Sequence, residues 1–356
     1  MKKIIVVVGA RPNFMKAAPL LRELENEKKL SSILVHTGQH YDNKMSDVFF
    51  EDLGIKKPEY MLNSGSGSHS FQTGKIMEQF EDVCNKVDPD LVIVFGDINS
   101  TMACSIVAKK MHIKLAHVEA GLRSNDREMP EEINRLVTDA ISDLFFVTEE
   151  SAQTNLLNEG HDNSKIHMVG NLMIDSLYFG LSKISNTSKE SSEDYGLITL
   201  HRPSNVDDIQ KLKDILHDLS LISKKLKLYF AMHPRTKKQI TKNNLEIGNI
   251  ELLESLPYLK FLKLMKNAKA VFTDSGGIQE ECTVLKIPCY TLRYNTERPI
   301  TVTSGTNRLV NPEKNIIFDS FIENQFDINP YYNLPLGWDG EASKRIVKIL
   351  NKKELL

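Results

Sequence analysis

The sequence has little of what marks metal-binding, secreted or membrane proteins. Its 356 residues include only four cysteines, Cys84, Cys104, Cys282 and Cys289. No two of them have the CxxC spacing of a zinc site, and no apolar run approaches the roughly 18 residues of a membrane span. The apolar stretch after Lys3 is interrupted by Arg11 and Pro12, long before a signal peptide would be complete. We therefore expect a cytoplasmic protein with reduced cysteines, no metal and no membrane partner.

An excess of charge of either sign is also missing. The 45 basic and 47 acidic residues leave a formal net charge of −2. This balance does not favour the strong attraction to a phosphate backbone that nucleic-acid binding requires. We expect no nucleic-acid partner, and any bound anion must be held locally by a few residues.

Short apolar runs alternate with longer amphipathic stretches, which is the pattern of βα units around a parallel sheet. The predicted strands fall into two series: 4–8, 33–36, 91–95, 115–118 and 144–147, then 196–200, 228–232, 270–273 and 289–292. The fold class is therefore α/β, with two doubly wound lobes in tandem. We expect a first lobe over residues 1–175, a second over 176–337 and a C-terminal helix over 338–356. The polar stretch 184–195 suits a linker near the division.

Residues 117–135, HVEAGLRSNDREMPEEINR, join a predicted strand to a predicted helix that begins at Pro130. Glu119 and Glu131 are therefore expected at the carboxyl edge of the sheet, where ligands bind in open α/β folds. Asp97 follows another strand in the same way, before Asn99 to Thr101, which can cap the next helix. The alternatives are ordinary structural roles: Glu131 and Glu132 would complement the helix dipole, and Asp97 would be a turn residue.

Two strand-to-helix turns suit an anion. The first, residues 9–13, has Arg11 and is followed by Lys16. The second is residues 274–281, DSGGIQEE, whose glycines allow a phosphate to approach the amides of a helix start. A carboxylate beside a bound phosphate suits a ribose diol, so this turn predicts a nucleotide. A plain βα turn is the alternative. His201 and His233 also follow predicted strands, where a histidine can act as an acid or base or, when charged, pair with a phosphate; a structural role is the alternative. Arg298 adds a guanidinium that suits bidentate phosphate binding.

Taken together, residues 9–12 with Lys16, residues 96–97, 117–135, 201–202, 274–281 and 296–299 resemble the non-hydrolysing UDP-N-acetylglucosamine 2-epimerases. The resemblance spans both predicted lobes. It implies the glycosyltransferase-B architecture, in which two Rossmann-like lobes hold a UDP-sugar in an active-site cleft and the last helix returns to the first lobe. It also implies a homodimer and no cofactor.

The resemblance further implies an activity. UDP-N-acetylglucosamine and UDP-N-acetylmannosamine would interconvert by elimination of UDP to 2-acetamidoglucal and re-addition, for the synthesis of surface polysaccharide or other glycan precursors. The implied catalytic residues are Asp97, Glu119, Glu131 and His201. Those implied to bind substrate or UDP are Arg11, Lys16, Ser275, Gly276, Gly277, Glu281 and Arg298. Gln39, His40 and His233 correspond to an allosteric UDP-N-acetylglucosamine site.

Several other functions remain open. A hydrolysing relative would release N-acetylmannosamine, and residues 117–135 with Arg298 favour the non-hydrolysing type. A 2-epimerase of a UDP-2,3-diacetamido uronic acid is an alternative because residues 35–54 and 117–135 resemble those enzymes too, although residues 296–299 favour UDP-N-acetylglucosamine. A glycosyltransferase would need an acceptor site that the sequence does not indicate. A non-catalytic UDP-sugar sensor is a remote alternative, since it would not need clustered carboxylates.

Overall fold

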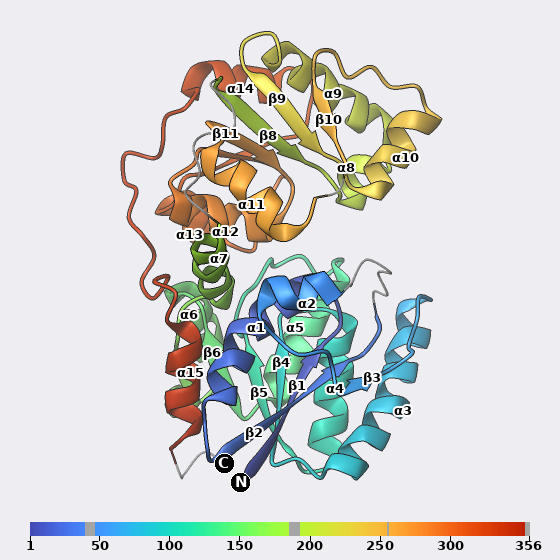
Figure 1. Cartoon of the computed structure of the whole chain (residues 1–356), viewed down its shortest axis with the longest axis vertical. Helices are drawn as coiled ribbons and strands as arrows, with labels where there is room; N and C mark the ends of the chain where they lie inside the picture. Colours follow the sequence, from blue (N-terminus) through green and yellow to red (C-terminus); the bar gives the residue numbers. More distant parts are fainter. Residues whose placement is uncertain (40–46, 185–192, 255, 353–356) are drawn as a thin grey trace. The chain divides into compact units, whose positions relative to one another are not determined.

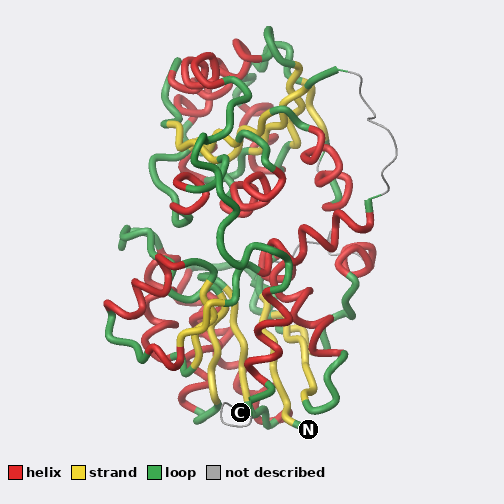
Figure 2. Tube along the Cα trace, turned by 90° about the vertical axis from the view of Figure 1, so that its left-hand side faces the viewer, coloured by secondary structure: helices red, strands yellow, loops and turns green. Residues whose placement is uncertain are grey.

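The computed structural model describes residues 1–39, 47–184, 193–254 and 256–352. The chain divides into two compact units, which we call unit 1 (Met1–Tyr178 with Leu336–Leu356) and unit 2 (Phe179–Pro335). The first division falls within helix α7 (Leu172–Lys183). Of the expected linker, residues 185–192 lie outside the described part of the chain. In each unit the sheet has helices on both faces (Figures 1 and 2).

Unit 1 is built on a parallel sheet with the strand order β3-β2-β1-β4-β5-β6-β7. Its strands are β1 (Lys2–Val8), β2 (Leu30–His36), β3 (Tyr60–Met61), β4 (Leu91–Phe95), β5 (Lys114–Val118), β6 (Leu144–Val147) and β7 (Ile166–Met168). Its helices are α1 (Arg11–Glu25), α2 (Asp47–Leu53), α3 (His69–Val87), α4 (Asn99–Lys110), α5 (Pro130–Ile141), α6 (Glu150–Asn158), the 3₁₀ turn Asn163–Lys165, α15 (Ala342–Leu350) and most of α7. The central strand β4 is buried at every position, as an apolar strand covered by helices on both faces must be.

Unit 2 repeats the arrangement with the order β10-β9-β8-β11-β12-β13. Its strands are β8 (Tyr195–Thr199), β9 (Lys227–Ala231), β10 (Glu251–Leu253), β11 (Ala270–Thr273), β12 (Cys289–Leu292) and β13 (Asn307–Val310). Its helices are α8 (Pro203–Val206), α9 (Ile209–Ile222), α10 (Pro234–Lys242), α11 (Tyr258–Asn267), α12 (Gly276–Leu285), α13 (Pro299–Thr303) and α14 (Ile316–Asn324). All strand pairs in both sheets are parallel, which confirms the predicted α/β class of two Rossmann-like lobes.

The last helix, α15, belongs to unit 1 and packs against α1. Its first amides, those of Ala342 and Ser343, donate to the buried Asp175 carboxylate of α7 at 3.1 and 2.8 Å. Just before it, the fully buried Trp338 donates from Nε1 to the Thr148 carbonyl at 3.1 Å. These bonds satisfy donors that a helix start and a buried indole otherwise leave unpaired, so they fix the C-terminal segment on unit 1.

Within the described ranges no helix is both long and apolar enough to cross a membrane. Among the same residues, no group of three or more His, Cys, Asp or Glu side chains is arranged to hold a metal ion. All four cysteines are buried free thiols.

Candidate active site

The carboxyl ends of β4 and β5 bring two of the predicted carboxylates together. The strands pair in parallel, with Phe95 opposite Val118, and the Gly96 amide donates to the Val118 carbonyl at 3.0 Å. Asp97 and Glu119 therefore leave neighbouring strands at the same edge of the sheet. Gly96 has a φ of +62°, and a Cβ on it would lie 3.3 Å from Oε2 of Glu119. Glycine is needed here both for its backbone conformation and for the space that the carboxylate occupies.

Glu119 is buried and bound by a cation. Its backbone has a φ of +68°, a conformation that residues other than glycine rarely adopt, and its amide donates to the Phe146 carbonyl at 3.0 Å. Its side chain forms an ion pair with Nζ of Lys16, which α1 supplies. The structure thus places Lys16 beside a predicted acid/base residue. A buried carboxylate next to an ammonium group suits proton transfer in a site shielded from water.

Asp97 is bound from α5 by Arg135. The guanidinium donates from Nε and Nη2 to Oδ2 of Asp97, and its Nη1 lies 2.5 Å from Oε2 of Glu132. Glu132 also accepts the amides of Ser124 and Asn125, each at 3.0 Å. Although burial opposes ionisation, the Ser124 amide and Arg135 hold the pKa of Glu132 below its usual range. Glu132 therefore organises the loop before α5, a specific role beyond complementing the helix dipole.

The other predicted residues of unit 1 have different surroundings. Glu131 lies in the first turn of α5 and is half-buried. Arg11 is exposed at the start of α1, with its guanidinium 5.4 Å from the ring centre of Phe49. Gln39 is buried, and its Oε1 accepts the amide and hydroxyl of Ser100 at 2.9 and 2.6 Å. His40 lies outside the described residues.

The prediction that Asn99 to Thr101 caps α4 was wrong. These residues are the first three of the helix, and its N-cap is Ile98, which has no oxygen in its side chain. Gln39 takes over that function by accepting the Ser100 amide from a different loop. A cap supplied from elsewhere in the fold cannot be identified from the local sequence.

In unit 2 the predicted histidine is held by Asp274, the first residue after β11. The buried Asp274 carboxylate accepts the amides of His201 and Arg202, the latter at 2.9 Å, and its Oδ1 lies 3.0 Å from Nδ1 of His201. Although burial opposes ionisation, these bonds from His201 and Arg202 keep the pKa of Asp274 below its usual range. The arrangement leaves Nε2 of His201 for other partners. Because β8 and β11 are neighbours on either side of the switch in strand order, this edge is where α/β sheets bind ligands.

A cluster of arginines and glutamates lies beside the start of α12. Glu297 accepts from Nη2 of Arg293 at 2.8 Å, and Nη2 of Arg202 lies 3.6 Å from its other oxygen. Arg298 pairs with Glu280 at 3.0 Å. Burial opposes ionisation of Glu297, but the charges of Arg293 and Arg202 prevail and lower its pKa well below the usual range. The cluster therefore holds several guanidinium groups near a helix N-terminus, an arrangement that suits a diphosphate.

Ser275, Gly276 and Gly277 lie at that start: Ser275 is the N-cap and the glycines are the first two residues of α12. All three are half-buried. A Cβ on Gly276 would lie 2.9 Å from Oε1 of Glu297, so glycine is required where the cluster approaches the helix. Glu281 lies about one turn further along α12, and its Oε1 accepts a hydrogen bond from the hydroxyl of Tyr258 at 2.9 Å. Burial, opposed by this bond, raises the pKa of Glu281 to about 7.

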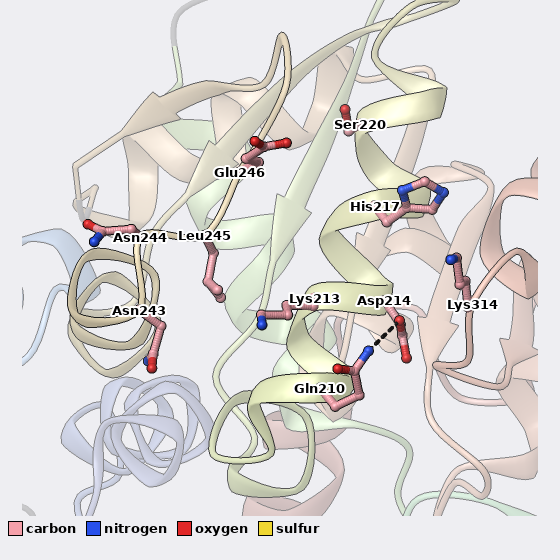
Figure 3. Close-up of a pocket in the computed structure, with 10 residues that line it drawn as sticks. All are labelled: Gln210, Lys213, Asp214, His217, Ser220, Asn243, Asn244, Leu245, Glu246 and Lys314. Atoms are coloured by element: carbon pink, nitrogen blue, oxygen red, sulfur yellow. Dashed lines mark hydrogen bonds between the residues drawn. The ribbon is translucent and has the colours of Figure 1, made fainter.

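Two cavities of unit 2 differ in character. One, of about 160 Å³, is lined by His201 and His233 together with apolar residues that include Leu256 and Phe261. The rings of the two histidines are 5.9 Å apart. The other, of about 450 Å³, is polar and carries charges of both signs from α9, from the loop after α10 and from Lys314 (Figure 3). None of the residues that line it is a predicted site residue, so only the smaller cavity adjoins the candidate site.

The structure thus groups the predicted residues by unit. Asp97, Glu119 and Lys16 gather at the sheet edge of unit 1, while Ser275, Gly276, Gly277, Glu281 and Arg298 gather around α12 of unit 2. The sequence-based prediction did not single out the residues that hold them, namely Arg135, Glu132, Asp274, Glu297 and Tyr258. A spacing of three residues between Glu132 and Arg135 on a predicted helix was available as an indication of their pairing.

Comparison with known proteins gives a consistent result. Residues 22–351 match the family described as UDP-N-acetylglucosamine 2-epimerase. The UDP-N-acetylglucosamine 2-epimerase of Methanococcus maripaludis is 42% identical over 365 residues, which cover 98% of each chain. The UDP-2,3-diacetamido-2,3-dideoxy-D-glucuronate 2-epimerase of Pseudomonas aeruginosa is 39% identical over 354 residues, covering 98% of this chain and 99% of its own.

Solved structures agree. The crystal structure of Methanocaldococcus jannaschii UDP-GlcNAc 2-epimerase, in complex with UDP-GlcNAc and UDP, aligns with a TM-score of 0.89 at 43% identity. The alignment covers 98% of this chain and 99% of that one.

Proposed function

The chain belongs to the UDP-N-acetylglucosamine 2-epimerase family, a family of isomerases, and we propose that it interconverts UDP-N-acetylglucosamine and UDP-N-acetylmannosamine by eliminating and re-adding UDP. The observation that carries this proposal is the pair of carboxylates, Asp97 and Glu119, at the ends of adjacent strands, each bound by a cation. The resemblance of the sequence to the family also leads us to propose a cytoplasmic homodimer that supplies precursors for surface polysaccharide or other glycans.

The chemistry explains why such residues are needed. Carbon 2 of the sugar has no carbonyl neighbour in the ring, so its proton is hard to remove unless the bond between carbon 1 and the UDP oxygen breaks as well. A base takes the proton, a double bond forms between carbons 1 and 2, and UDP leaves with the electron pair of the broken bond. Delivery of a proton to the opposite face of carbon 2 and attack of a UDP oxygen on carbon 1 give the epimer. The cycle is redox-neutral.

We assign the two tasks to different units. Asp97, Glu119 and Glu131 of unit 1 are the acid/base carboxylates, and Lys16 holds Glu119. In unit 2, Arg298 and the amides at the start of α12 bind the diphosphate. His201, oriented by Asp274, stabilises the departing UDP.

The nucleoside part of UDP fits two further features of unit 2. Glu281 is assigned to the ribose hydroxyls, because a carboxylate close to a phosphate site is a suitable acceptor for a diol. The cavity beside His201, with Phe261 in its wall, is assigned to the uracil ring, which prefers an apolar pocket with an aromatic neighbour.

A second substrate has specific support. The 39% identity to the P. aeruginosa enzyme, over nearly the whole of both chains, favours a 2-epimerase of a UDP-2,3-diacetamido uronic acid as the alternative. Both candidates share the same elimination and differ only in the sugar substituents.

Proton NMR of UDP-N-acetylglucosamine incubated with the protein in D₂O separates the candidates. A UDP-N-acetylmannosamine signal with deuterium at carbon 2 is the expected result. Free N-acetylmannosamine with UDP would show a hydrolysing enzyme. An unchanged spectrum, with turnover of the diacetamido uronic acid substrate, would establish the alternative.

A further inference from the structure

One fully buried histidine close to the acid/base residues has no part in the mechanism above. His117 lies near the end of β5, two residues before Glu119, and its side chain is entirely inaccessible. Both ring nitrogens are engaged. Nε2 lies 2.8 Å from the Gly96 carbonyl, and Nδ1 lies 2.6 Å from Oδ1 of Asp139 on α5. The ring therefore connects the ends of β4 and β5 with α5.

The partners of the ring determine its protonation. A carbonyl oxygen only accepts, so Nε2 must carry a hydrogen. Asp139 is ionised: although burial opposes this, the neighbouring His117 and the Arg123 guanidinium, whose Nη2 lies 2.7 Å from Oδ2, keep the pKa of the carboxyl below its usual range. Its Oδ2 also receives the Gly121 amide at 3.0 Å, and its Oδ1 is then an acceptor too. Nδ1 must then carry a hydrogen as well. A ring that donates from both nitrogens is an imidazolium, and it faces an ionised carboxylate.

This bridge holds the backbone next to Asp97 and the backbone next to Glu119. The Gly96 carbonyl belongs to the peptide bond that precedes Asp97, and Gly121 follows Glu119 by two residues. The backbone of Glu119 has a positive φ, which is strained for a residue with a side chain and persists only where the surroundings enforce it. Through Asp139, the imidazolium holds the loop that contains this residue.

A contribution to stability alone is a weak explanation for such a bridge. Burying two opposite charges costs desolvation energy that their attraction only partly returns. At the other end of β5 a similar connection is made by a partly exposed ion pair, which loses less hydration energy. Asp143 binds Lys109 there and accepts the Leu115 amide at 2.8 Å. The buried version occurs at the end of the strand that carries Glu119.

We propose that His117 is a positioning residue: locked as an imidazolium between Gly96 and Asp139, it sets the relative placement of Asp97 and Glu119. This inference rests on the proposed function, because it assigns His117 a role only through those carboxylates. It predicts that loss of the bridge slows the proton transfer at carbon 2 and leaves the binding of UDP, assigned to unit 2, unchanged.

Two conservative variants of His117 each remove one of the two hydrogen bonds that form the bridge. In His117→Gln the amide replaces the donor to Gly96, and in His117→Asn it replaces the donor to Asp139, so each keeps one bond and loses the charge. We expect kcat and the rate of deuterium entry at carbon 2 to fall about 10- to 100-fold in both, the scale of a small misplacement of catalytic groups. KM and the Kd for UDP should stay within about twofold, and Asp143→Asn, the matched control, should keep the wild-type kcat.

The outcomes distinguish the positioning role of His117 from the proposed function. If Asp97→Asn and Glu119→Gln lose activity while folded His117 variants keep the wild-type kcat, the positioning role is wrong and the proposed function stands. If Asp97→Asn and Glu119→Gln are both active, the proposed acid/base site itself is wrong. If the His117 variants do not fold, nitrogen-15 NMR of the ring in the wild-type protein at neutral pH decides: two protonated nitrogens support the inference, and one bare nitrogen overturns it.

Discussion

Arg135 donates to a single oxygen of Asp97 from two of its nitrogens, Nε at 3.1 Å and Nη2 at 2.6 Å, while its Nη1 binds Glu132. This fork ties the carboxylate after β4 to the first turns of α5. Since Glu132 also binds the loop that precedes α5, one guanidinium sets the position of Asp97 relative to the whole segment that carries Glu131.

Replacement of Arg135 by lysine tests this relationship. A lysine keeps the charge, but a single ammonium group does not reproduce the planar fork that spans Asp97 and Glu132. We expect kcat to fall about 10- to 100-fold with little change in KM, because misplacement of a catalytic group affects the reaction step. Arg127→Lys, at an exposed position in the stretch before α5, is the control and should remain fully active. Wild-type kcat in Arg135→Lys would refute the positioning of Asp97 by Arg135.

Gly96→Ala should impair catalysis more than Gly160→Ala, a substitution at another glycine with a positive φ. The added methyl group would lie 3.3 Å from Oε2 of Glu119, which is tighter than an ordinary contact, so the carboxylate must shift by a few tenths of an ångström beside Lys16. Gly160→Ala is the matched control, since Gly160 also has a positive φ but nothing lies within 4 Å of its added Cβ. Both variants should lose roughly 1 kcal/mol of stability from backbone strain. Only Gly96→Ala should lose more than about 10-fold in kcat, and equal kcat values in the two variants would contradict this.

The carboxylates themselves make a direct prediction. Asp97→Asn, Glu119→Gln and Glu131→Gln should each reduce kcat by roughly 10² or more, the scale for general acid/base groups. Each variant should give the circular dichroism spectrum of a folded protein. Glu128→Gln, an exposed position in the same stretch, should have the wild-type rate. Near-wild-type turnover in all three carboxylate variants would remove them from the catalytic site.

The raised pKa of Glu281 should make the free energy of unfolding depend on pH. Burial raises its pKa from the ordinary 4.5 to about 7 in the folded protein, so between these values the folded state binds more protons than the unfolded state. The contribution of Glu281 to stability is fully present below about pH 4.5 and is lost as the pH rises through about 7. Relative to Glu281→Gln, which keeps an acceptor for Tyr258, the wild-type protein should lose free energy of unfolding from about pH 5 to about pH 8. Urea denaturation measures this, and parallel curves for the two proteins would contradict it.

The fold was largely predictable because its inner strands are apolar. Strands at 91–95, 144–147, 270–273 and 289–292 have the predicted bounds, and the other five predicted strands differ by one residue or a few at their ends. The strands that the sequence did not reveal are β3, β7, β10 and β13, the edge strands of the two sheets. These have two to four residues and are partly exposed, so they lack the continuous apolar run by which a buried parallel strand is recognised.

Those residues of the candidate site that follow apolar strands were predictable in the same way. Asp97, Glu119 and His201 were identified because each follows an apolar strand, and that position alone places a side chain at the ligand-binding edge of a sheet. Their partners could not be found in this way. Arg135 reaches Asp97 across 38 residues of sequence, and Asp274 reaches His201 across 73. Such pairs are determined by how helices pack on the sheet, which local sequence patterns do not specify.

Cleavage and re-formation of the bond between carbon 1 and UDP can be followed by a double-label experiment. UDP-N-acetylglucosamine carrying oxygen-18 in the bridge between carbon 1 and the β-phosphorus is incubated with the protein in D₂O, and the recovered substrate is analysed by phosphorus and proton NMR. Elimination releases a β-phosphate that rotates before it re-adds. We therefore expect oxygen-18 in the non-bridging positions of the β-phosphate together with deuterium at carbon 2. Deuterium at carbon 2 with all of the oxygen-18 still in the bridge would contradict this expectation.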